Sequence, residues 1–367
     1  MHLLQPKADI HLNHLKQNYL AIKKMVGDAE VMAVIKANAY GHGAIPIAHV
    51  LSDMGVHGFC VALGSEAVEL INAGIREPIL HLGKITSDNF ELYNPGQVHC
   101  TINSMEDLLE LKENASANSP IFAHLKIDTG MGRMGVRFEN AESIIQMLSE
   151  TPEIRVEGVY SHFATAEGKD TKYRDWQLDQ FRKVIKLANS ILPDIKYFHI
   201  ANSAGILNCP DSHFNMVRPG ISLYGISPLG KPHHSLNPVM KMKALVVLVK
   251  KMNAGDSVGY SRLYTAEKDE KIALLQAGYA DGIPTVFSNS GSVEIKGSQY
   301  PIIGKVSMDL IAINCGEDTI KEGDEAVFWG GEHENTRLEY LAIKYKKIPY
   351  EFLTGVSTRV VRNLINE

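Results

Sequence analysis

Eight short apolar runs, each separated from the next by a helical pattern, occupy the chain from about residue 30 to residue 220. In order they are Val31–Ile35, Gly58–Ala62, Pro78–Leu82, Val98–Ile102, Ile121–Ile127, Val156–Tyr160, Tyr197–Ala201 and Phe214–Arg218. Such runs predict parallel strands that are covered on both faces by the intervening helices. Their spacing of roughly 24 residues suits a strand, a helix and two short loops. The alternation therefore predicts an α/β fold with an N-terminal (β/α)8 barrel of the TIM type; a doubly wound sheet is the alternative, but it normally has fewer strands.

Several of the intervening helical patterns begin at a residue that can cap the first turn. The helical patterns include Ala44–Met54, Ser65–Ala73, Ser104–Glu113, Asn140–Leu148 and Lys172–Ile191, and three of these five begin at a Ser or an Asn. After residue 230 the pattern changes to strand-like segments separated by Gly, Asp and Asn turns, with a last helical run at Thr336–Lys344. The strand-like segments are Met242–Val249, Lys271–Leu275, Ser292–Ile295, Ile302–Val306, Leu310–Asn314 and Glu325–Trp329. We therefore predict a barrel domain over residues 1–230 and a smaller β-rich domain over residues 231–367.

Composition and charge exclude several classes of function. With 367 residues, of which 45% are hydrophobic, the chain can bury a large core. Its net charge of −5, without a long basic run, gives no electrostatic footprint for nucleic acid or for an anionic membrane. Polar residues and Pro6 interrupt the N-terminal stretch, so we find neither a signal-peptide core nor a spanning segment and expect a cytoplasmic protein. No CxxC pair occurs, which argues against a zinc site or a disulfide framework built on Cys60, Cys100, Cys209 and Cys315.

Lys36 stands at the end of the first apolar run, immediately before a glycine-containing loop. Partial desolvation there would lower the pKa of its ammonium group, and the neutral amine can form an imine with a carbonyl or with pyridoxal phosphate. The alternative is a lysine that only extends into solvent from a strand end.

Further polar side chains follow the other predicted strands, where barrel active sites form. They are Tyr40 after the first strand, Lys126 at the end of the fifth and Arg133 after it, His162 after the sixth, Asn202 and Ser203 after the seventh, and Arg218 at the end of the eighth. A lone histidine such as His162 is by default a structural residue. The convergence of so many polar groups on one face instead indicates a catalytic site.

Nine stretches of the chain resemble the alanine racemase family, whose members are fold type III pyridoxal phosphate enzymes. They are AVIKANAYGHG (33–43), KIDTGMGRMG (126–135), YSHFATA (160–166), ANSAG (201–205), VRPGISLYG (217–225), VGYSRLY (258–264), GYADGIP (278–284), VSMD (306–309) and PYEFL (349–353). The resemblance runs in order through both predicted domains. It implies a pyridoxal 5'-phosphate-dependent isomerase that interconverts L-alanine and D-alanine and supplies D-alanine for cell-wall synthesis.

The resemblance also implies how the cofactor is held. Lys36 would carry it as a Schiff base, and Arg218 would face the pyridine nitrogen, which stays unprotonated because arginine has no acceptor. Donors to the phosphate would be hydroxyl groups and backbone N–H groups rather than charges alone. Further cofactor contacts are expected from Tyr40, Leu82, His162, Asn202, Ser203, Gly220, Ile221 and Tyr350.

Racemisation needs a base on each face of a planar intermediate. The resemblance assigns these bases to Lys36 and Tyr260, and it makes His162, backed by Arg218, the neighbour that lowers the pKa of Tyr260. It implies a homodimer in which Tyr260, Tyr279, Met308 and Asp309 reach the site of the partner subunit.

Lys126 and Arg133 would repel each other in a cofactor cleft. The resemblance makes Lys126 a candidate for carbamylation, which would turn it into an anion that directs Arg133 toward the cofactor phenolate and the substrate. One departure from the family pattern concerns the substrate corridor: after GYADG many members carry an arginine, but no cation follows here until Lys296.

Three other functions remain as alternatives. A racemase of broader amino-acid specificity would differ only in the shape of the substrate corridor. A non-catalytic pyridoxal phosphate-binding barrel would lack the β-rich domain and Tyr260. A metal-dependent barrel hydrolase could use His81, His162, His199 and Asp128, but it would need a closely spaced histidine pair after the first strand, where Lys36 stands.

Overall fold

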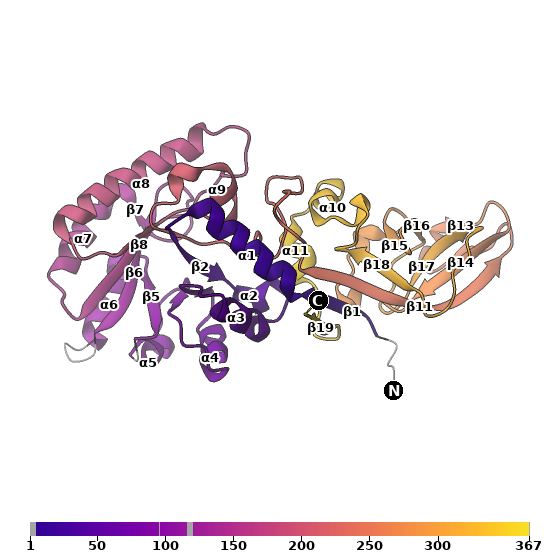
Figure 1. Cartoon of the computed structure of the whole chain (residues 1–367), viewed down its shortest axis with the longest axis horizontal. Helices are drawn as coiled ribbons and strands as arrows, with labels where there is room; N and C mark the ends of the chain where they lie inside the picture. Colours follow the sequence, from indigo (N-terminus) through magenta and orange to yellow (C-terminus); the bar gives the residue numbers. More distant parts are fainter. Residues whose placement is uncertain (1–4, 95, 116–119, 367) are drawn as a thin grey trace. The chain divides into compact units, whose positions relative to one another are not determined.

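The computed structural model of the chain describes residues 5–94, 96–115 and 120–366, which form two compact units (Figure 1). The barrel unit consists of Asn18–Ala39 and Ala44–Leu223. The β-rich unit consists of the described parts of Met1–Gln17, Tyr40–Gly43 and Tyr224–Glu367. This division differs from the predicted domains at the N-terminus, because the first strand pairs with strands from the end of the chain.

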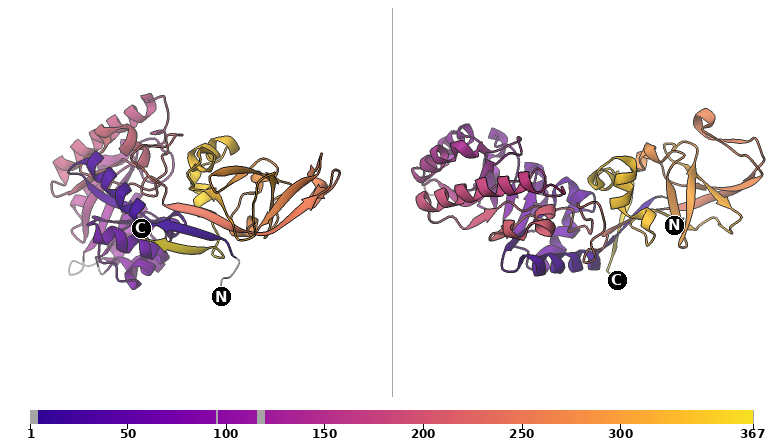
Figure 2. Two further views of the ribbon diagram at one scale, coloured as in Figure 1. Left: turned by 45° about the vertical axis from the view of Figure 1, so that its right-hand side comes forward. Right: turned by 90° about the horizontal axis from the view of Figure 1, so that it is seen from above.

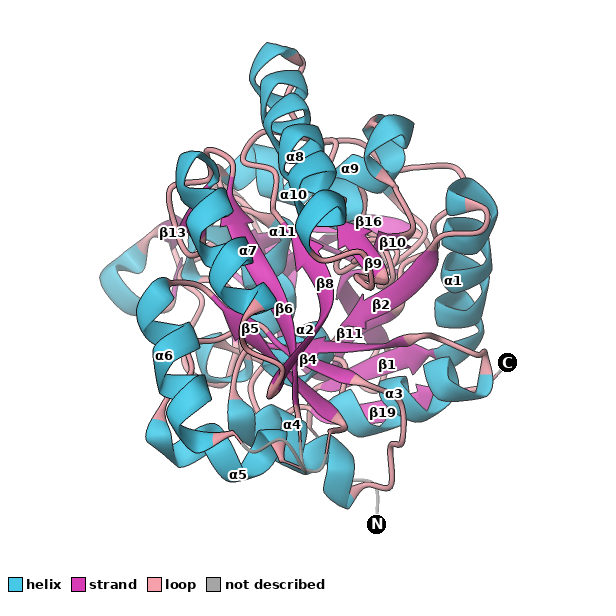
Figure 3. Cartoon of the chain, turned by 90° about the vertical axis from the view of Figure 1, so that its left-hand side faces the viewer, coloured by secondary structure: helices cyan, strands magenta, loops and turns pink. Residues whose placement is uncertain are grey.

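Parallel strands form the centre of the barrel unit (Figure 3). They are β2 (Glu30–Val34), β3 (Gly58–Val61), β4 (Ile79–His81), β5 (Val98–Ile102), β6 (Ile121–Asp128), β8 (Ile154–Tyr160), β9 (Tyr197–His199) and β10 (Met216–Val217), with the short β7 (Val136–Arg137) beside β6. The sheet runs in the order β10-β2-β3-β4-β5-β6-β8-β9. Just beyond its two end strands the Arg218 N–H donates to the Ala201 carbonyl at 2.9 Å, which joins them. The predicted (β/α)8 barrel is confirmed, and all eight predicted strands overlap an observed one.

Helices surround these strands (Figure 3). They are α1 (Leu12–Val26), α3 (Ala44–Asp53), α4 (Gly64–Asn72), α5 (Phe90–Tyr93), α6 (Met105–Asn114), α7 (Ala141–Ser149), α8 (Lys172–Ile191) and α9 (Ser203–Asn208), with short 3₁₀ turns at Ser87–Asn89, Phe138–Asn140 and Pro210–Ser212. Ser104 caps α6 by accepting a hydrogen bond from the Asp107 N–H. Among the described residues, no helix combines the length and the apolar character that crossing a membrane requires.

An antiparallel sheet dominates the β-rich unit. Its strands are β1 (Lys7–His11), β11 (Met240–Met252), β14 (Glu270–Leu275), β15 (Ser292–Ile295), β16 (Ser298–Ile303), β17 (Ile311–Gly316), β18 (Glu325–Trp329) and β19 (Val361–Ile365). They follow the order β14-β17-β16-β15-β18-β11-β1-β19, and β11 also pairs with β14, so the first part of the sheet closes on itself. This unit also contains two helices, α10 (Leu338–Tyr345) and α11 (Pro349–Thr354), and 3₁₀ turns at Thr285–Phe287 and Glu334–Thr336. A short hairpin and two further 3₁₀ turns are described below.

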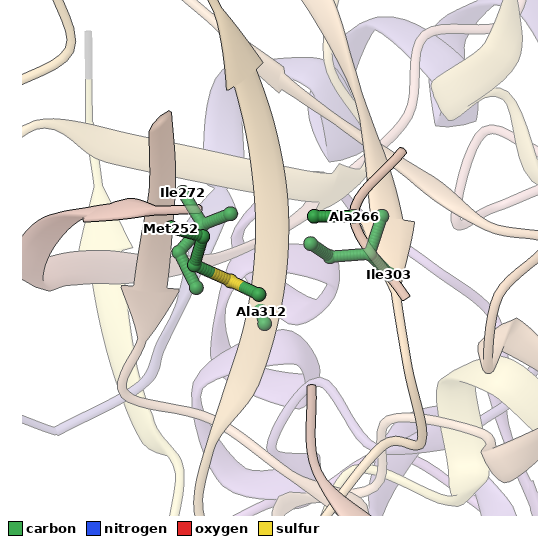
Figure 4. Close-up of a cluster of buried hydrophobic side chains, with 5 residues drawn as sticks. All are labelled: Met252, Ala266, Ile272, Ile303 and Ala312. Atoms are coloured by element: carbon green, nitrogen blue, oxygen red, sulfur yellow. The ribbon is translucent and has the colours of Figure 1, made fainter. Parts of the chain in front are cut away.

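A small apolar core supports one loop of the β-rich unit. It consists of Met252, Ala266, Ile272, Ile303 and Ala312 (Figure 4), with Val258, Tyr264 and Leu274 packed against it. Two of these packed residues belong to the short hairpin of β12 (Ser257–Val258) and β13 (Tyr264–Thr265). The hairpin therefore stands on buried apolar side chains, and it carries the 3₁₀ turn Tyr260–Arg262 at its tip.

Several elements of the β-rich unit, including β12, β13 and α11, differ from the sequence predictions. Strands β1 and β19 were not predicted; they lie side by side in a parallel pair (Figure 2), which joins residues more than 350 positions apart in the sequence. The predicted strand Ile302–Val306 is wrong in its bounds, because β16 begins at Ser298 to pair with β15 in a hairpin and ends before Gly304, whose φ is +70°.

Candidate active site

Lys36 follows β2 by two residues and opens α2 (Lys36–Tyr40), a turn with left-handed backbone. Ala37, Asn38, Ala39 and Tyr40 all have φ between +52° and +54°. Such a conformation costs a non-glycine residue about 1–2 kcal/mol, so the surroundings must hold it. The Ala37 N–H donates to Glu66 Oε1 at 2.6 Å, and the Ala44 N–H donates to Asn38 Oδ1 at 2.8 Å. These bonds fix the backbone at the base of the Lys36 side chain.

The environment of Lys36 favours its neutral amine. Burial lowers the pKa of Lys36, and the Arg133 cation lowers it further, while Cys60 and Glu66 act in the opposite direction. An amine with a lowered pKa is a better nucleophile at neutral pH.

Lys126 lies close enough to three other cations to be affected by their charges. Its side chain is only 6% exposed, and Nζ lies 5.6 Å from the centre of the Tyr160 ring. Burial first, and then Arg133, Arg218 and Lys36, lower the pKa of Lys126 to about 8, against the opposing effect of Asp128. A group of four basic side chains around one part of the barrel is suited to an anionic ligand.

Arg218 is buried and held by neutral acceptors. Its Nη1 donates to the carbonyl oxygen of His199 at 3.1 Å and to His199 Nδ1 at 2.5 Å. Its Nη2 donates to the Ser161 carbonyl at 2.7 Å and lies 3.4 Å from His162 Nδ1. Nε is the one Arg218 nitrogen for which the described residues provide no acceptor.

His162 is uncharged in this environment. Burial lowers its pKa well below the usual value, and Arg218, Arg133 and Lys126 lower it further. Arg218 Nη2 faces Nδ1 and Asn202 Nδ2 faces Nε2, both as donors; when Nδ1 accepts from Arg218, the imidazole proton is on Nε2. Asn202 Nδ2 lies 3.5 Å from that Nε2.

The ends of β9 and β10 bring a hydroxyl and several backbone groups together. Ser203 Oγ accepts the N–H groups of Gly220 at 2.9 Å and Ser222 at 3.2 Å. Asn202 caps α9 by accepting the Gly205 N–H at 3.0 Å. Ile221 is fully buried beside them in sequence. Leu82, at the end of β4, donates its N–H to the Val61 carbonyl at 2.9 Å.

Two carboxylates shape these loops although sequence reasoning assigned neither of them this role. Glu66 Oε2 accepts the Ala62 and Leu63 N–H groups, so Glu66 links the loop after β3 to the turn after β2. Asp128 Oδ1 accepts the N–H groups of Gly130 and Gly132, just before Arg133. The Asp-Thr-Gly sequence predicts the turn that Asp128 holds. No local sequence signal predicts the bond between Glu66 and the Ala37 N–H.

The remaining predicted site residues belong to the β-rich unit. The rings of Tyr40 and Tyr350 lie 5.7 Å apart. Tyr260, in the turn at the tip of the β12–β13 hairpin, is 72% exposed. Tyr279, in the 3₁₀ turn Tyr279–Asp281, and Met308 are also exposed, and their two loops are joined by backbone bonds from Tyr279 to Ser307 and from Ala280 to Met308. Arg359 pairs with Asp309 at 2.7 Å.

The structure therefore gathers Lys36, Lys126, Arg133, His162 and Arg218 within the barrel unit, and it groups Tyr279, Met308 and Asp309 separately in the β-rich unit. The position of Tyr260 relative to Lys36 stays a prediction.

The histidines considered for a metal site have other partners. His81 Nδ1 lies 2.8 Å from the Tyr93 hydroxyl, and His199 lies between His124 and Arg218. Within the described ranges, no group of three or more His, Cys, Asp or Glu side chains is arranged to hold a metal ion.

Comparison with known proteins gives consistent matches along the chain. Residues 10–228 match the model of the alanine racemase N-terminal domain, and residues 239–364 match that of the C-terminal domain. A curated alanine racemase from Carboxydothermus hydrogenoformans is 38% identical over 362 residues, which cover 97% of this chain and 98% of that protein. The crystal structure of alanine racemase from Streptomyces lavendulae superposes with a TM-score of 0.95 at 33% identity, covering 100% and 98% of the two chains. That of alanine racemase from Bartonella henselae, which has covalently bound pyridoxal phosphate, has a TM-score of 0.89 at 30% identity and covers 98% of this chain and 99% of its own.

Proposed function

The chain belongs to the alanine racemase family, and from that premise we propose that it interconverts L-alanine and D-alanine with pyridoxal 5'-phosphate as its cofactor. The observation that carries the proposal is Lys36, a half-buried amine of lowered pKa, which lies at the end of a barrel strand under the influence of a neighbouring cation. We further propose that the enzyme acts in the cytoplasm and that its D-alanine is used for cell-wall synthesis.

The residues of the barrel unit fit this cofactor. Pyridoxal phosphate is an anion with an aldehyde and a ring nitrogen that can accept a hydrogen bond. Lys36 supplies the amine that the aldehyde requires. The other basic side chains supply charge of the opposite sign to the phosphate and phenolate. The Arg218 Nε–H, for which the described residues offer no acceptor, is a donor for the ring nitrogen.

The phosphate contacts belong to the proposal. Ser203 Oγ accepts the N–H groups of Gly220 and Ser222, which use its two lone pairs, so its own proton is available to a phosphate oxygen. The Ile221 N–H is a further candidate donor, and so are the hydroxyls of Tyr40 and Tyr350. The Gly220 N–H, which was also predicted to contact the phosphate, donates to Ser203 Oγ and supports the site through that hydroxyl. Leu82 and Asn202 are proposed as flanking contacts.

The catalytic proposal assigns one base to each face of the substrate. When bound, the cofactor withdraws electrons from the alanine Cα and makes its C–H bond more acidic. Lys36, as a neutral amine, can take or return the proton on one face. Tyr260 can do so on the other face once its hydroxyl is ionised.

The state of His162 supports this role for Tyr260. With Nδ1 occupied by the Arg218 donor, the His162 Nε2–H can donate to a tyrosinate oxygen and stabilise it. Arg133, which is exposed on the loop shaped by Asp128, is proposed to bind the cofactor phenolate and the substrate carboxylate.

We propose a homodimer with shared active sites, in which Tyr260, Tyr279, Met308 and Asp309 complete the site of the partner. The exposure of large side chains supports it: Tyr260 is 72% exposed, Met308 51% and Tyr279 46%. Leaving several large apolar groups of one unit in water is unfavourable, and a second copy of the chain would cover them.

Carbamylation of Lys126 also belongs to the proposal. With a pKa of about 8, about one tenth of this amine is neutral at pH 7. The neutral nitrogen can attack carbon dioxide; an N–C bond forms, one proton leaves, and the side chain becomes an anion. The repulsion between Lys126 and the cations Arg133, Arg218 and Lys36 would then become attraction.

Borohydride reduction of the purified protein, followed by peptide mass spectrometry, tests the cofactor proposal. We expect a reduced pyridoxyl adduct on Lys36 alone, because that amine is held at the strand end in a cationic environment. An adduct on a different lysine would overturn the assignment. A chiral assay over several amino acids tests the substrate: turnover of alanine well above that of larger amino acids supports an alanine racemase, and equal turnover supports a racemase of broader specificity.

A further inference from the structure

Three buried histidines of the barrel unit form a continuous chain of close contacts that ends at Arg218. His99 on β5, His124 on β6 and His199 on β9 are 9%, 1% and 0% exposed. His99 Nδ1 lies 3.3 Å from His124 Nε2, and His124 Nδ1 lies 2.9 Å from His199 Nε2. His199 Nδ1 then lies 2.5 Å from Arg218 Nη1. None of these three histidines has a role in the proposed chemistry.

A glycine in the neighbouring strand provides the space that the His124 ring occupies. Strand β8 lies between β6 and β9, and its residue opposite His124 is Gly158. A Cβ atom at Gly158 would lie 2.5 Å from His124 Nδ1. The φ of Gly158 is not in the left-handed region, so the backbone does not require glycine there. The absence of a side chain at this position instead admits the His124 ring and its bond to His199.

Arg218 sets the direction of every hydrogen bond in the chain. Arginine has donors only, so His199 Nδ1 must accept, and the His199 proton is on Nε2. That Nε2–H donates to His124 Nδ1, which puts the His124 proton on Nε2. The same step repeats at His99. All three rings are therefore the Nε2–H tautomer, and a ring that carried a second proton would interrupt the chain.

The surroundings keep the three rings neutral. Burial lowers the pKa of His99 to about 4, with Glu157 opposing and His57 and Lys196 adding to the shift. Burial and the Arg218 cation lower the pKa of His199 well below its usual value, and burial and neighbouring imidazoles do the same for His124. Two of the imidazole rings also stack on aromatic rings: Phe122 stacks on His99 at 5.4 Å, and Tyr160 stacks on His199 at 4.9 Å.

Arg218 has no carboxylate partner among the described residues. Its four acceptors, two imidazole nitrogens and two backbone carbonyl oxygens, are all neutral. A carboxylate in the place of His199 would fix Arg218 equally well but would cancel its charge. A single neutral imidazole could turn over or change its tautomer, and it would then present an N–H to the guanidinium. His124 prevents this, because its Nδ1 accepts a hydrogen bond from His199 Nε2–H and so holds both the orientation and the tautomer of the His199 ring.

We propose that His199, His124 and His99 are positioning residues that hold Arg218 as a fully charged cation, with its Nε–H left for the acceptor atom of a bound ligand. The chain acts through Arg218 and has no contact with the reacting atoms. The three histidine tautomers follow from the hydrogen bonds within the protein. Only the effect of the histidines on catalysis rests on the proposed function.

Neutron diffraction from deuterated crystals of the full-length protein tests the tautomers directly. We expect deuterium on Nε2, and none on Nδ1, of all three histidines. Deuterium on any of the three Nδ1 atoms would overturn the proposal. This result does not depend on activity, so it stands even if the protein proves to bind no pyridoxal phosphate.

Two variants at the middle of the chain test its effect on Arg218. His124→Phe fills the space but breaks both bonds, whereas His124→Asn keeps one acceptor and one donor. Because a hydrogen bond to a charged group is lost or misdirected, we expect kcat to fall roughly 10-fold in His124→Phe, with a much smaller change in KM, and to recover partly in His124→Asn. The absorbance spectrum of the bound cofactor should change with pH differently in His124→Phe and in the parent.

His57→Gln is the matched control, because His57 is a nearby histidine that packs edge-to-face against Tyr197 at 4.9 Å and makes no hydrogen bond to His99, His124 or His199 among the described residues. It should keep the parent kcat and the parent spectrum. If His124→Phe folds and shows the parent kcat and spectrum, or if His57→Gln loses as much as His124→Phe, the positioning role is refuted. If His124→Phe fails to fold, His124→Asn and the neutron result still decide.

Discussion

Replacing Glu66 by alanine is expected to loosen the turn that carries Lys36 and to lower the free energy of unfolding by roughly 2–4 kcal/mol. The Glu66 carboxylate accepts the N–H groups of Ala37 at 2.6 Å, Ala62 at 2.8 Å and Leu63 at 3.1 Å. A hydrogen bond to a charged group contributes about 1.5–3 kcal/mol, but water can replace the carboxylate at partly exposed N–H groups, so the total stays well below three full bonds. The left-handed turn, strained by about 1–2 kcal/mol per residue, would then be free to relax.

Glu66 also affects the pKa of Lys36, so Glu66→Ala and Glu66→Gln can distinguish its electrostatic role from its hydrogen-bonding role. Its carboxylate raises the pKa of Lys36, so removing the charge should lower that pKa further. Glu66→Gln removes the charge but keeps a carbonyl oxygen that can accept from Ala37. We therefore expect a lower Lys36 pKa in both variants, but a large loss of stability only in Glu66→Ala.

Urea unfolding measures the stability, and the pH dependence of Lys36 acylation in cofactor-free protein, read by mass spectrometry, measures the pKa. A parent-like unfolding midpoint in Glu66→Ala would refute the bracing role. A Lys36 pKa that rises in Glu66→Gln would refute the electrostatic one.

Three further predictions concern residues of the barrel unit. Because the pKa of Lys126 is about 8 in the folded chain and 10.5 for a lysine free of these influences, the unfolded chain binds this proton more tightly, and stability should rise as pH increases from about 8 to 10.5. In carbon dioxide-free buffer Lys126→Met should lack this rise and be more stable at pH 7, by on the order of 3 kcal/mol; equal urea midpoints would contradict this. Arg218→Glu should allow the ring nitrogen of the cofactor to be protonated, so racemisation slows and a long-wavelength absorbance band develops with alanine; normal racemisation without the band would show that Arg218 does not face that nitrogen. Gly158→Ala should lower stability by about 1–3 kcal/mol, because its methyl group would overlap His124; an unchanged thermal midpoint would show that the His124 ring does not need this space.

Much of the barrel could be predicted from the sequence because its signals are local. Each strand is a short apolar run next to a helical pattern, and α8 begins and ends at the predicted residues Lys172 and Ile191. The barrel topology then brings Lys36, Lys126 and Arg218 together, since each lies near the carboxyl end of a parallel strand. This grouping needs no knowledge of side-chain contacts.

Other features have no local signal. The pairing of β1 with β19 depends on contacts between the two ends of the chain. The left-handed turn at residues 37–40 contains no glycine, and it is held by tertiary and local bonds, among them those to Glu66, to Asn38 and from the Ala39 N–H to the Ile35 carbonyl. The histidine chain joins strands that are separated in sequence, and the glycine that admits it has an ordinary backbone conformation. Such features depend on tertiary contacts, which periodicity does not encode.

The most direct test of the central claim, a racemase whose two bases come from different subunits, is the activity of mixed dimers of Lys36→Ala and Tyr260→Phe. Each variant alone should lose racemisation of alanine, measured by chiral chromatography, because each lacks one base at every site. After subunit exchange in equal amounts, half of the dimers are mixed and each holds one intact site, so roughly a quarter of the parent activity should return. No recovery, despite exchange demonstrated by mass spectrometry of the intact dimers, would contradict the shared site.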